Sequence, residues 1–460
     1  MKTKSRFNHF LQIQQLPESI QKLTRFYVGI CMLQSVAFHI TDTFLVLYLL
    51  ETHTWGQVSI IFAVQMATQL IFDYPTGILG DWLGQKKILM SAFIFLSSAN
   101  LCLLLSNSFV IYVLFAVLSG LGNSQFSGAL DSWYDSHYTI QCSEIDPDRE
   151  IYGLLSGRVY SMYLGIAGLT ILASGLIANN FSRLILFIIQ IGVYIILGVC
   201  VWLGLTPSSK AENCDLKNEE KKPDSIKNNL ENSSNQEPKG SYFSILLKGL
   251  KFVFSQKKMW LFFFGIAIYN AFLNSVWTTL ILFPLYNQYA ITDTLTGVIR
   301  WVNLTIDVFL VVILAKYSSK TKKKELGYIL SLAGMLLCLI LVSVYYTLLP
   351  PTENFSLGRY LGIWLISLSM AIPYRLTWLF YSRIIIDLVP NSIRNSIYSF
   401  IPTVILLLAI PANILGGFII DGYGFVAGIL LVVGFAVIGI FFQIFSFKIK
   451  NSSSSPSINL

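Results

Sequence analysis

The sequence predicts an all-α polytopic membrane protein with twelve transmembrane helices in two six-helix bundles and with both termini in the cytoplasm. Three observations support this fold class. The 460 residues are 54% hydrophobic and 12% charged, which is about half the charged share of an ordinary soluble domain. Twelve apolar runs reach the length of about 20 residues that a membrane-spanning helix needs. One long polar segment divides these runs six and six.

The twelve apolar runs are joined by short polar connections, and each run holds few or no charges. Glycine and proline inside them are tolerated in membrane helices because neighbouring helices satisfy the freed backbone groups. The predicted spans are 26–50, 57–79, 88–106, 108–133, 153–178, 184–205, 258–284, 294–316, 325–349, 358–387, 396–420 and 424–447.

The polar segments between and beyond the spans set the expected domain boundaries. Residues 1–25 form a cytoplasmic N-terminal segment, 26–206 the first bundle and 258–447 the second bundle. Residues 207–257 are rich in Asn, Ser, Glu and Lys, and such a composition cannot bury enough apolar surface to fold. We therefore expect a mostly disordered cytoplasmic linker there and a flexible tail at 448–460.

Lysine and arginine concentrate in alternate loops, which predicts the orientation. The N-terminal segment, the loop at 85–87 and the loop at 316–324 are basic, whereas the loops after the first and third predicted spans carry no lysine or arginine. The net charge of +8 is therefore a topology signal and does not indicate nucleic-acid binding. The six cysteines show no metal-ligand spacing, so we expect no metal and no cofactor. The expected state is a monomeric, multi-pass protein in the lipid bilayer of the cell membrane.

Ionisable side chains within the spans follow a pattern of three. The third, sixth, ninth and twelfth spans have none in their interiors, as expected for helices that face lipid. A shift of 234 residues places Asp73 on Asp307, which suggests an internal repeat. Buried carboxylates suit a group that loads and releases a proton, but fixed ion pairs that lock helices together are the alternative. The candidates for proton coupling or substrate binding are His39, Asp42, Asp73, Arg300, Asp307 and Arg375.

Aromatic side chains are dense in several spans of the second half. Such surfaces suit bulky, amphipathic or cationic ligands through stacking and cation–π contacts, although packing and interfacial anchoring account for many membrane aromatics. The candidate cavity aromatics are Trp277, Trp301 and Trp378.

The segment that ends the second span carries a motif. It reads Asp73-Tyr-Pro-Thr-Gly-Ile-Leu-Gly-Asp-Trp-Leu-Gly-Gln-Lys-Lys87. This segment resembles the signature of the major facilitator superfamily, G-x-x-x-D-R-x-G-R-R/K-R/K, between its second and third helices. The matching residues are Gly77, Asp81, Gly84, Lys86 and Lys87, whereas Trp82 and Gln85 replace two basic positions.

The resemblance implies further roles. In the family this loop latches the two halves in one state, and Asp131, Asp135 and Arg158 resemble the charge relay beside that latch. The Asp-Tyr-Pro-Thr-Gly segment looks like the variant found in many bacterial efflux-type, drug:proton antiporter-like members. Two features of proton-driven drug exporters are missing: an arginine early in the fourth span and a Gly-Pro pair in the fifth.

We expect a secondary transporter that exports a small organic molecule by proton antiport, with alternating access to a midplane site. The main alternative is uptake of a sugar, peptide or anionic metabolite by proton symport, in which Arg300 and Arg375 bind substrate anions. An integral-membrane enzyme would need a catalytic cluster, and the sequence shows none, so no catalytic residue is expected. A membrane sensor that uses 207–257 as its output is the remaining alternative.

Overall fold

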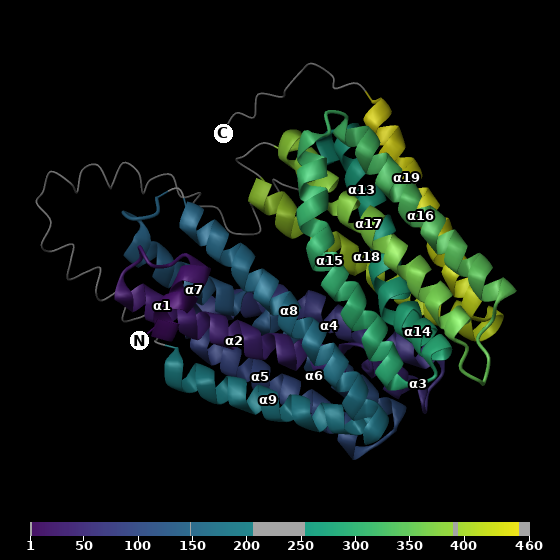
Figure 1. The fold of residues 1–460 in the computed structure, drawn as a ribbon, viewed down its shortest axis with the longest axis horizontal. Helices are drawn as coiled ribbons and strands as arrows, with labels where there is room; N and C mark the ends of the chain where they lie inside the picture. Colours follow the sequence, from purple (N-terminus) through teal and green to yellow (C-terminus); the bar gives the residue numbers. More distant parts are fainter. Residues whose placement is uncertain (1, 148, 206–253, 390–393, 450–460) are drawn as a thin grey trace, which may run out of the picture. The chain divides into compact units, whose positions relative to one another are not determined.

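The computed structural model describes residues 2–147, 149–205, 254–389 and 394–449 (Figure 1). All regular secondary structure in these ranges is helical. Most of the expected linker and most of the expected tail lie outside the described residues. In the first half the helices are α1 (Lys2–Leu11), α2 (Glu18–Asp42), α3 (Leu45–Leu50), α4 (Trp55–Leu83), α5 (Gln85–Leu105), α6 (Phe109–Phe126), α7 (Ala129–Cys142), α8 (Glu150–Asn180) and α9 (Arg183–Gly204).

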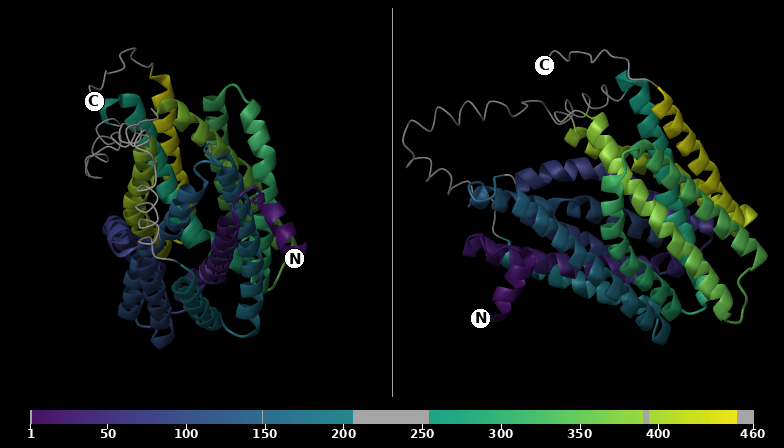
Figure 2. Two further views of the ribbon diagram at one scale, coloured as in Figure 1. Left: turned by 90° about the vertical axis from the view of Figure 1, so that its left-hand side faces the viewer. Right: turned by 45° about the horizontal axis from the view of Figure 1, so that its top comes forward.

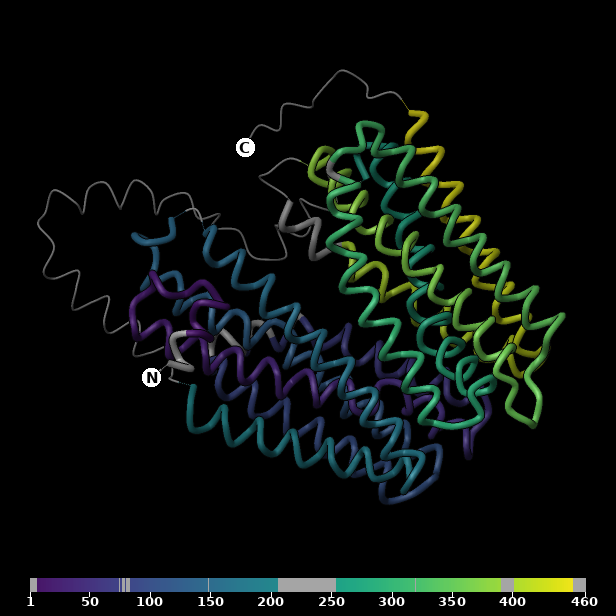
Figure 3. Tube along the Cα trace, viewed as in Figure 1, coloured from purple at the N-terminus to yellow at the C-terminus, as the bar shows by residue number. Residues whose placement is uncertain are grey.

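The second half is also helical, and Figure 3 shows its Cα trace coloured in chain order. Its first span contains a π-helical stretch, η1, where the hydroxyls of Thr278 and Thr279 donate to carbonyls five residues earlier. The elements are α13 (Lys257–Ala271), η1 (Phe272–Ile281), α14 (Leu282–Ala290), α15 (Asp293–Lys320), α16 (Lys324–Leu348), α17 (Leu357–Leu388), α18 (Arg394–Tyr423) and α19 (Phe425–Lys448).

Twelve helical segments of the described chain are long and apolar enough to cross a membrane. This confirms the predicted all-α fold class and the number of spans, whereas the cytoplasmic placement of both termini stays a prediction. Three of the spans are built from more than one element: α2 with α3, α6 with α7, and α13 with η1 and α14. The break between α6 and α7 falls at Gly128, whose φ of 72° lies in the left-handed region that favours glycine.

The described helices group into two compact units. The first unit contains residues 1–48, 64–239 and 300–305, and the second contains 49–63, 240–299 and 306–460. The first turns of α4 therefore group with the second unit, and a short stretch of α15 groups with the first. The bundle boundaries expected from the sequence, 26–206 and 258–447, stay a prediction.

The core of the first unit is aromatic and is crossed by satisfied polar groups. Tyr27 of α2 stacks on Tyr134 of α7 with ring centroids 4.1 Å apart. Gln190 of α9 donates to the carbonyl of Ala37 at 2.6 Å and accepts from the Thr41 hydroxyl at 3.1 Å, so α2 and α9 are joined without a stranded polar atom on Gln190. Such bonds fix the register of two membrane helices that hydrophobicity alone would leave free to slide.

In the second unit α19 packs along α13, as both views in Figure 2 show, and α16 packs against α17 and α19. The close approach depends on small residues. A Cβ on Gly265 of α13 would lie 2.7 Å from the carbonyl oxygen of Gly439 on α19, so neither position has room for a side chain. Phe272 and Phe435 stack beside this contact with centroids 3.8 Å apart.

The four spans without interior charges, α5, α9, α16 and α19, each expose large apolar side chains. Examples are Ile94 on α5, Trp202 on α9, Leu330 on α16 and Phe441 on α19, each 60–64% exposed. An apolar side chain of this exposure is stable in contact with lipid rather than water. The exposure agrees with the expectation that these spans face the bilayer, which itself stays a prediction.

Candidate functional site

Asp42 ends α2 in the interior of the first span, and the chain bends at Thr43 before α3 begins. Its carboxylate lies 3.6 Å from the Nη2 atom of Arg300, and both residues belong to the first unit. The Asp42 side chain is 45% exposed and that of Arg300 is 16% exposed. Charge-assisted hydrogen bonds measure about 2.7–2.9 Å, so this pair is an ion pair without a direct hydrogen bond.

His39 lies one turn before Asp42 on the same helix. Its Nδ1 is 2.8 Å from the carbonyl oxygen of Ser35, and because a carbonyl only accepts, Nδ1 carries the proton. The ring meets Tyr163 of α8 edge-on at 5.4 Å, and the Ser35 hydroxyl donates to the Tyr163 carbonyl at 2.7 Å. These contacts give His39 a structural environment between α2 and α8, and a role in coupling stays a prediction.

Asp307 of α15 and Arg375 of α17 form a second ion pair. The Arg375 Nε donates to Oδ1 at 2.6 Å and Nη2 donates to Oδ2, so the contact is bidentate. The two side chains are only 14% and 22% exposed. The structure thus pairs Asp307 with Arg375 and places Arg300 beside Asp42.

The motif after the second span starts on α4 and not in a loop. Helix α4 runs without interruption to Leu83, and Gly84, with φ of 86°, makes the turn into α5. Lys86 and Lys87 lie in the first turn of α5, where the helix dipole disfavours cations. The side chain of Asp81 lies outside those that the structure describes, and only the helical backbone is described for Gly77.

Asp73 is exposed on α4, and Thr76 beside it ties α4 to α6. The Thr76 hydroxyl lies 3.1 Å from the carbonyl oxygen of Ser124 and 2.8 Å from that of Phe72. Thr76 of the Asp-Tyr-Pro-Thr-Gly segment therefore has a packing role. The coupling role expected for Asp73 stays a prediction.

The three residues of the expected charge relay have different partners among the described contacts, and the relay itself stays a prediction. Asp131 accepts a hydrogen bond from the Tyr27 hydroxyl at 2.7 Å. Asp135 forms an ion pair with Arg149, a residue that the sequence analysis missed, and Arg158 lies with its guanidinium 5.7 Å from the Phe10 ring centre. Arg149 has a left-handed backbone, with φ of 57°, before α8, and this turn brings it back to α7.

The three candidate cavity tryptophans each make a separate packing contact. Trp277 is 3% exposed within η1, so it is a core residue. Trp301 of α15 packs on Gly168 of α8, where a Cβ would lie 3.2 Å from its ring. Trp378 is 36% exposed and meets Tyr381 edge-on at 5.4 Å. These contacts favour a packing role for the three tryptophans.

Asp421, at the end of α18, is a further residue that the sequence analysis missed. Its Oδ1 accepts from the Trp55 backbone N–H at 2.9 Å and its Oδ2 from the Gly56 N–H at 2.7 Å, within the second unit. These donors lie in the first turn of α4, where a helix lacks internal acceptors and attracts anions. A Cβ on Gly417 would lie 2.2 Å from the Ser59 hydroxyl, so α18 approaches α4 closely here.

Asp146, in the connection between α7 and α8, is a buried acid outside the predicted spans. It accepts from the Tyr138 hydroxyl at 2.7 Å and from the N–H groups of Tyr152 at 3.0 Å and Ile151 at 3.2 Å. Burial opposes its ionisation, but these hydrogen bonds outweigh burial and lower the pKa of Asp146 below its usual value. Among the described residues, no group of three His, Cys, Asp or Glu could hold a metal ion.

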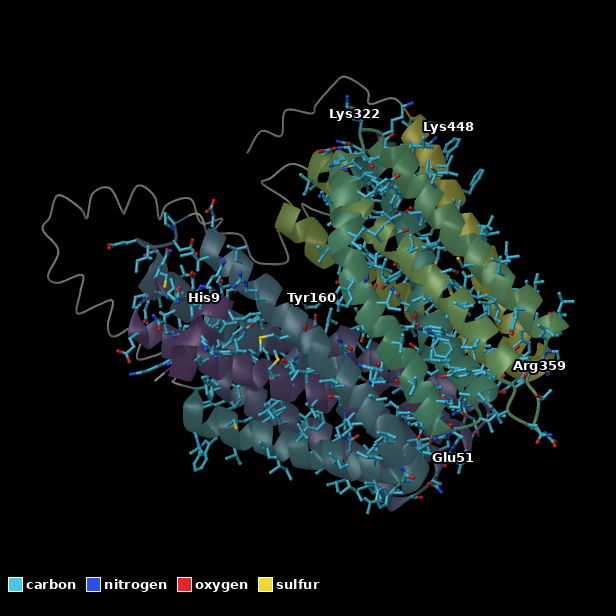
Figure 4. The ribbon with its side chains drawn as sticks, viewed as in Figure 1. His9, Glu51, Tyr160, Lys322, Arg359 and Lys448 are labelled. Carbon is cyan, nitrogen blue, oxygen red and sulfur yellow. The ribbon has the colours of Figure 1, made fainter. Side chains whose placement is uncertain are left out.

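Charged residues mark the two ends of the second unit. In Figure 4, Lys322 and Lys448 lie at one end and Arg359 lies at the other. The cluster at the first end includes the ion pair of Lys324 with Asp387 and the bonds from Arg383 to the carbonyls of Ser318 and Thr321, which satisfy the C-terminus of α15.

Comparison with known proteins places this geometry in a family. The family model of the Major Facilitator Superfamily matches residues 28–380. The crystal structure of the nucleoside transporter NupG is similar with a TM-score of 0.72 and 13% identity over 93% of this chain and 100% of that one. A D-xylose-proton symporter is similar with a TM-score of 0.63 and 12% identity over 93% and 97%. No curated protein sequence matches the chain significantly. The chain therefore belongs to the Major Facilitator Superfamily, and it is a membrane transporter rather than an enzyme.

Proposed function

We propose that the protein is a secondary active transporter that couples the movement of a small organic molecule to a proton through Asp42. The observation that carries this proposal is the loose ion pair of Asp42 with Arg300, at 3.6 Å and with the carboxylate 45% exposed. An exposed carboxylate in a span can exchange a proton with water, and a pair without a direct hydrogen bond costs little to separate.

Protonation of Asp42 would remove half of this pair. The positive charge of Arg300 is then no longer balanced by Asp42, and a span carrying that charge favours a different arrangement of its neighbours. Release of the proton restores the pair. A site with two charge states of this kind supplies the two states that alternating access needs.

Asp307 is less suited to this role. Its bidentate contact with Arg375 and the low exposure of both side chains favour a permanently ionised pair that positions α15 against α17. We therefore assign proton coupling to Asp42 and a positioning role to Asp307 and Arg375.

The direction that we propose is export. The support is the Asp73-Tyr-Pro-Thr-Gly77 segment, which resembles efflux-type members of the superfamily. Uptake by proton symport is the second candidate, and its support is the similarity to the D-xylose-proton symporter and to the nucleoside transporter.

The orientation in the membrane that we propose follows from the positions of the basic residues. The basic segments before α2, at the start of α5 and at the end of α15 would face the cytoplasm, and the motif residues Gly77, Asp81 and Gly84 would gate that side. The protein would act as a monomer in the lipid bilayer of the cell membrane.

Purified protein in vesicles with a pH gradient of either sign tests the proposal. A pH-sensitive dye inside the vesicles reports proton movement when uridine, D-xylose or phenyltrimethylammonium is added. Asp42→Asn should abolish gradient-dependent movement, and Glu353→Gln, which removes a carboxylate from an exposed loop, should not. The sign of the gradient that drives accumulation separates export from uptake. Normal gradient-driven flux in Asp42→Asn would refute the coupling role.

A further inference from the structure

The first unit contains an open pocket of about 350 Å³ beside the break in the fourth span. Gln34 and Phe38 of α2, Phe126 at the end of α6 and Asp131 of α7 line it together with Tyr163 of α8. Sites for small organic ligands start at about 300 Å³. The pocket therefore has room for one small organic molecule.

The backbone break also lines this pocket. Helix α6 ends at Phe126, and α7 starts after Ser127 and Gly128, both of which are pocket residues. Irregular backbone at membrane depth is tolerated where it is buried in protein or lines a hydrated cavity. The left-handed conformation at Gly128 thus belongs to the irregular backbone that lines the pocket.

The pocket carries a carboxylate without a basic partner among the described residues. Asp131 accepts from the Tyr27 hydroxyl, and none of the ion pairs in the described ranges includes it. Arg158, which the sequence grouped with Asp131, lies over Phe10 instead, and the nearby Arg149 pairs with Asp135. The first turn of α7 stabilises the negative charge of Asp131 but supplies no full positive charge.

The walls of the pocket favour a cationic ligand, as the Asp131 carboxylate does. Phe38 and Phe126 lie with ring centroids 5.4 Å apart, and Tyr163 adds a third ring. The faces of aromatic rings attract cations, most strongly where water is excluded. The Gln34 amide offers an acceptor oxygen to a ligand N–H group. An anionic ligand would meet the carboxylate and the ring faces, and both repel it.

We propose that this pocket binds an organic cation, a quaternary or protonated amine with an apolar body, whose positive charge pairs with Asp131 and whose body packs on Phe38 and Phe126. The assignment rests on the proposed transport function for its physiological meaning, because it names the substrate class of that transporter. Ligand binding itself requires neither a proton gradient nor net transport.

The test is calorimetric titration of the full-length protein in nanodiscs with phenyltrimethylammonium, and with benzenesulfonate as the anionic counterpart of similar size. The wild type should bind the cation and not the anion. Asp131→Asn should weaken cation binding by about tenfold or more, the usual effect of losing a charged partner. Glu150→Gln is the matched control, because it removes a carboxylate from the first turn of α8 outside the pocket, and it should leave affinity unchanged.

Phe38→Leu supplies a second variant in case Asp131→Asn does not fold, and it should weaken cation binding by about threefold to tenfold through lost cation–π contact. Unchanged affinity in the folded Asp131→Asn protein, or in Phe38→Leu if only that variant folds, would overturn the assignment, as would equal binding of benzenesulfonate. Vesicle flux separates the two proposals. Asp131-dependent binding without any flux would contradict the transport mechanism alone, and flux with Asp131-independent binding would contradict the pocket alone.

Discussion

Removal of the Asp421 carboxylate should expose the first turn of α4. The backbone N–H groups of Trp55 and Gly56 have no acceptor within their own helix, so their protection from solvent exchange depends on the two carboxylate oxygens at 2.9 and 2.7 Å. Val58, which donates to the Thr54 carbonyl at 2.9 Å, does not depend on Asp421 and serves as an internal reference.

The size of the expected change in exchange rate follows from these two hydrogen bonds. A well-shielded hydrogen bond to a charged group contributes about 1.5–3 kcal/mol, and loss of a helix N-terminal cap costs about 0.5–2 kcal/mol. Because Asp421 is exposed, the lower part of these ranges applies, at about 1–2 kcal/mol for Asp421→Ala. Each 1.4 kcal/mol is tenfold in an equilibrium constant, so exchange at Trp55 and Gly56 should accelerate about 5-fold to 30-fold.

Hydrogen–deuterium exchange of the full-length protein in nanodiscs measures this change. Asp421→Asn keeps one acceptor oxygen and should show a smaller acceleration than Asp421→Ala, whereas the exposed loop variant Glu353→Ala should show none. Unchanged exchange at Trp55 and Gly56 in Asp421→Ala, or equal acceleration at Val58, would refute the capping role.

Three further predictions follow from other contacts. Asp307→Asn removes the bidentate partner of Arg375 and should lower the unfolding free energy by about 3 kcal/mol, which a lower melting temperature would show. A second substitution, Arg375→Met, should partly restore the melting temperature because it removes the uncompensated charge. A double variant that melts no higher than Asp307→Asn would argue against the ion pair. Gly128→Ala should cost about 1–2 kcal/mol because an L side chain is strained at φ of 72°, and a melting temperature equal to the wild type would contradict this. Asp146 has a lowered pKa, so its ionised form adds stability that is present above about pH 4 and lost as the pH falls through its folded-state pKa. The difference in melting temperature between wild type and Asp146→Asn should therefore shrink below about pH 4, and a constant difference would contradict the assignment.

Much of the fold could be predicted because a membrane constrains local sequence strongly. The length and hydropathy of twelve runs were sufficient for the spans, since each needs about 20 apolar residues. Gly84 was also predictable, because a glycine between two apolar runs is suited to the positive φ of a tight turn. The left-handed Gly128 was not, because 118–128 contains several glycines and nothing in the sequence distinguishes the one that breaks the span.

The ion-pair and hydrogen-bond partners of the site residues were harder to predict than the residues themselves. Asp42, Arg300, Asp307 and Arg375 all stood out as charges in apolar runs, but their pairing is set by helix packing between distant segments. Asp421 did not stand out, because it follows the last apolar residues of α18 and looks like an ordinary polar end. Its role depends on the N-terminus of α4, more than 360 residues away in sequence.

The coupling role of Asp42 is tested most directly by substrate-induced proton movement in vesicles that contain wild-type or Asp42→Asn protein. A transported compound should move protons with the wild type and none with the variant. The variant should still exchange labelled compound across the membrane when no gradient is present. Proton movement of equal size in the two proteins would contradict the coupling role of Asp42.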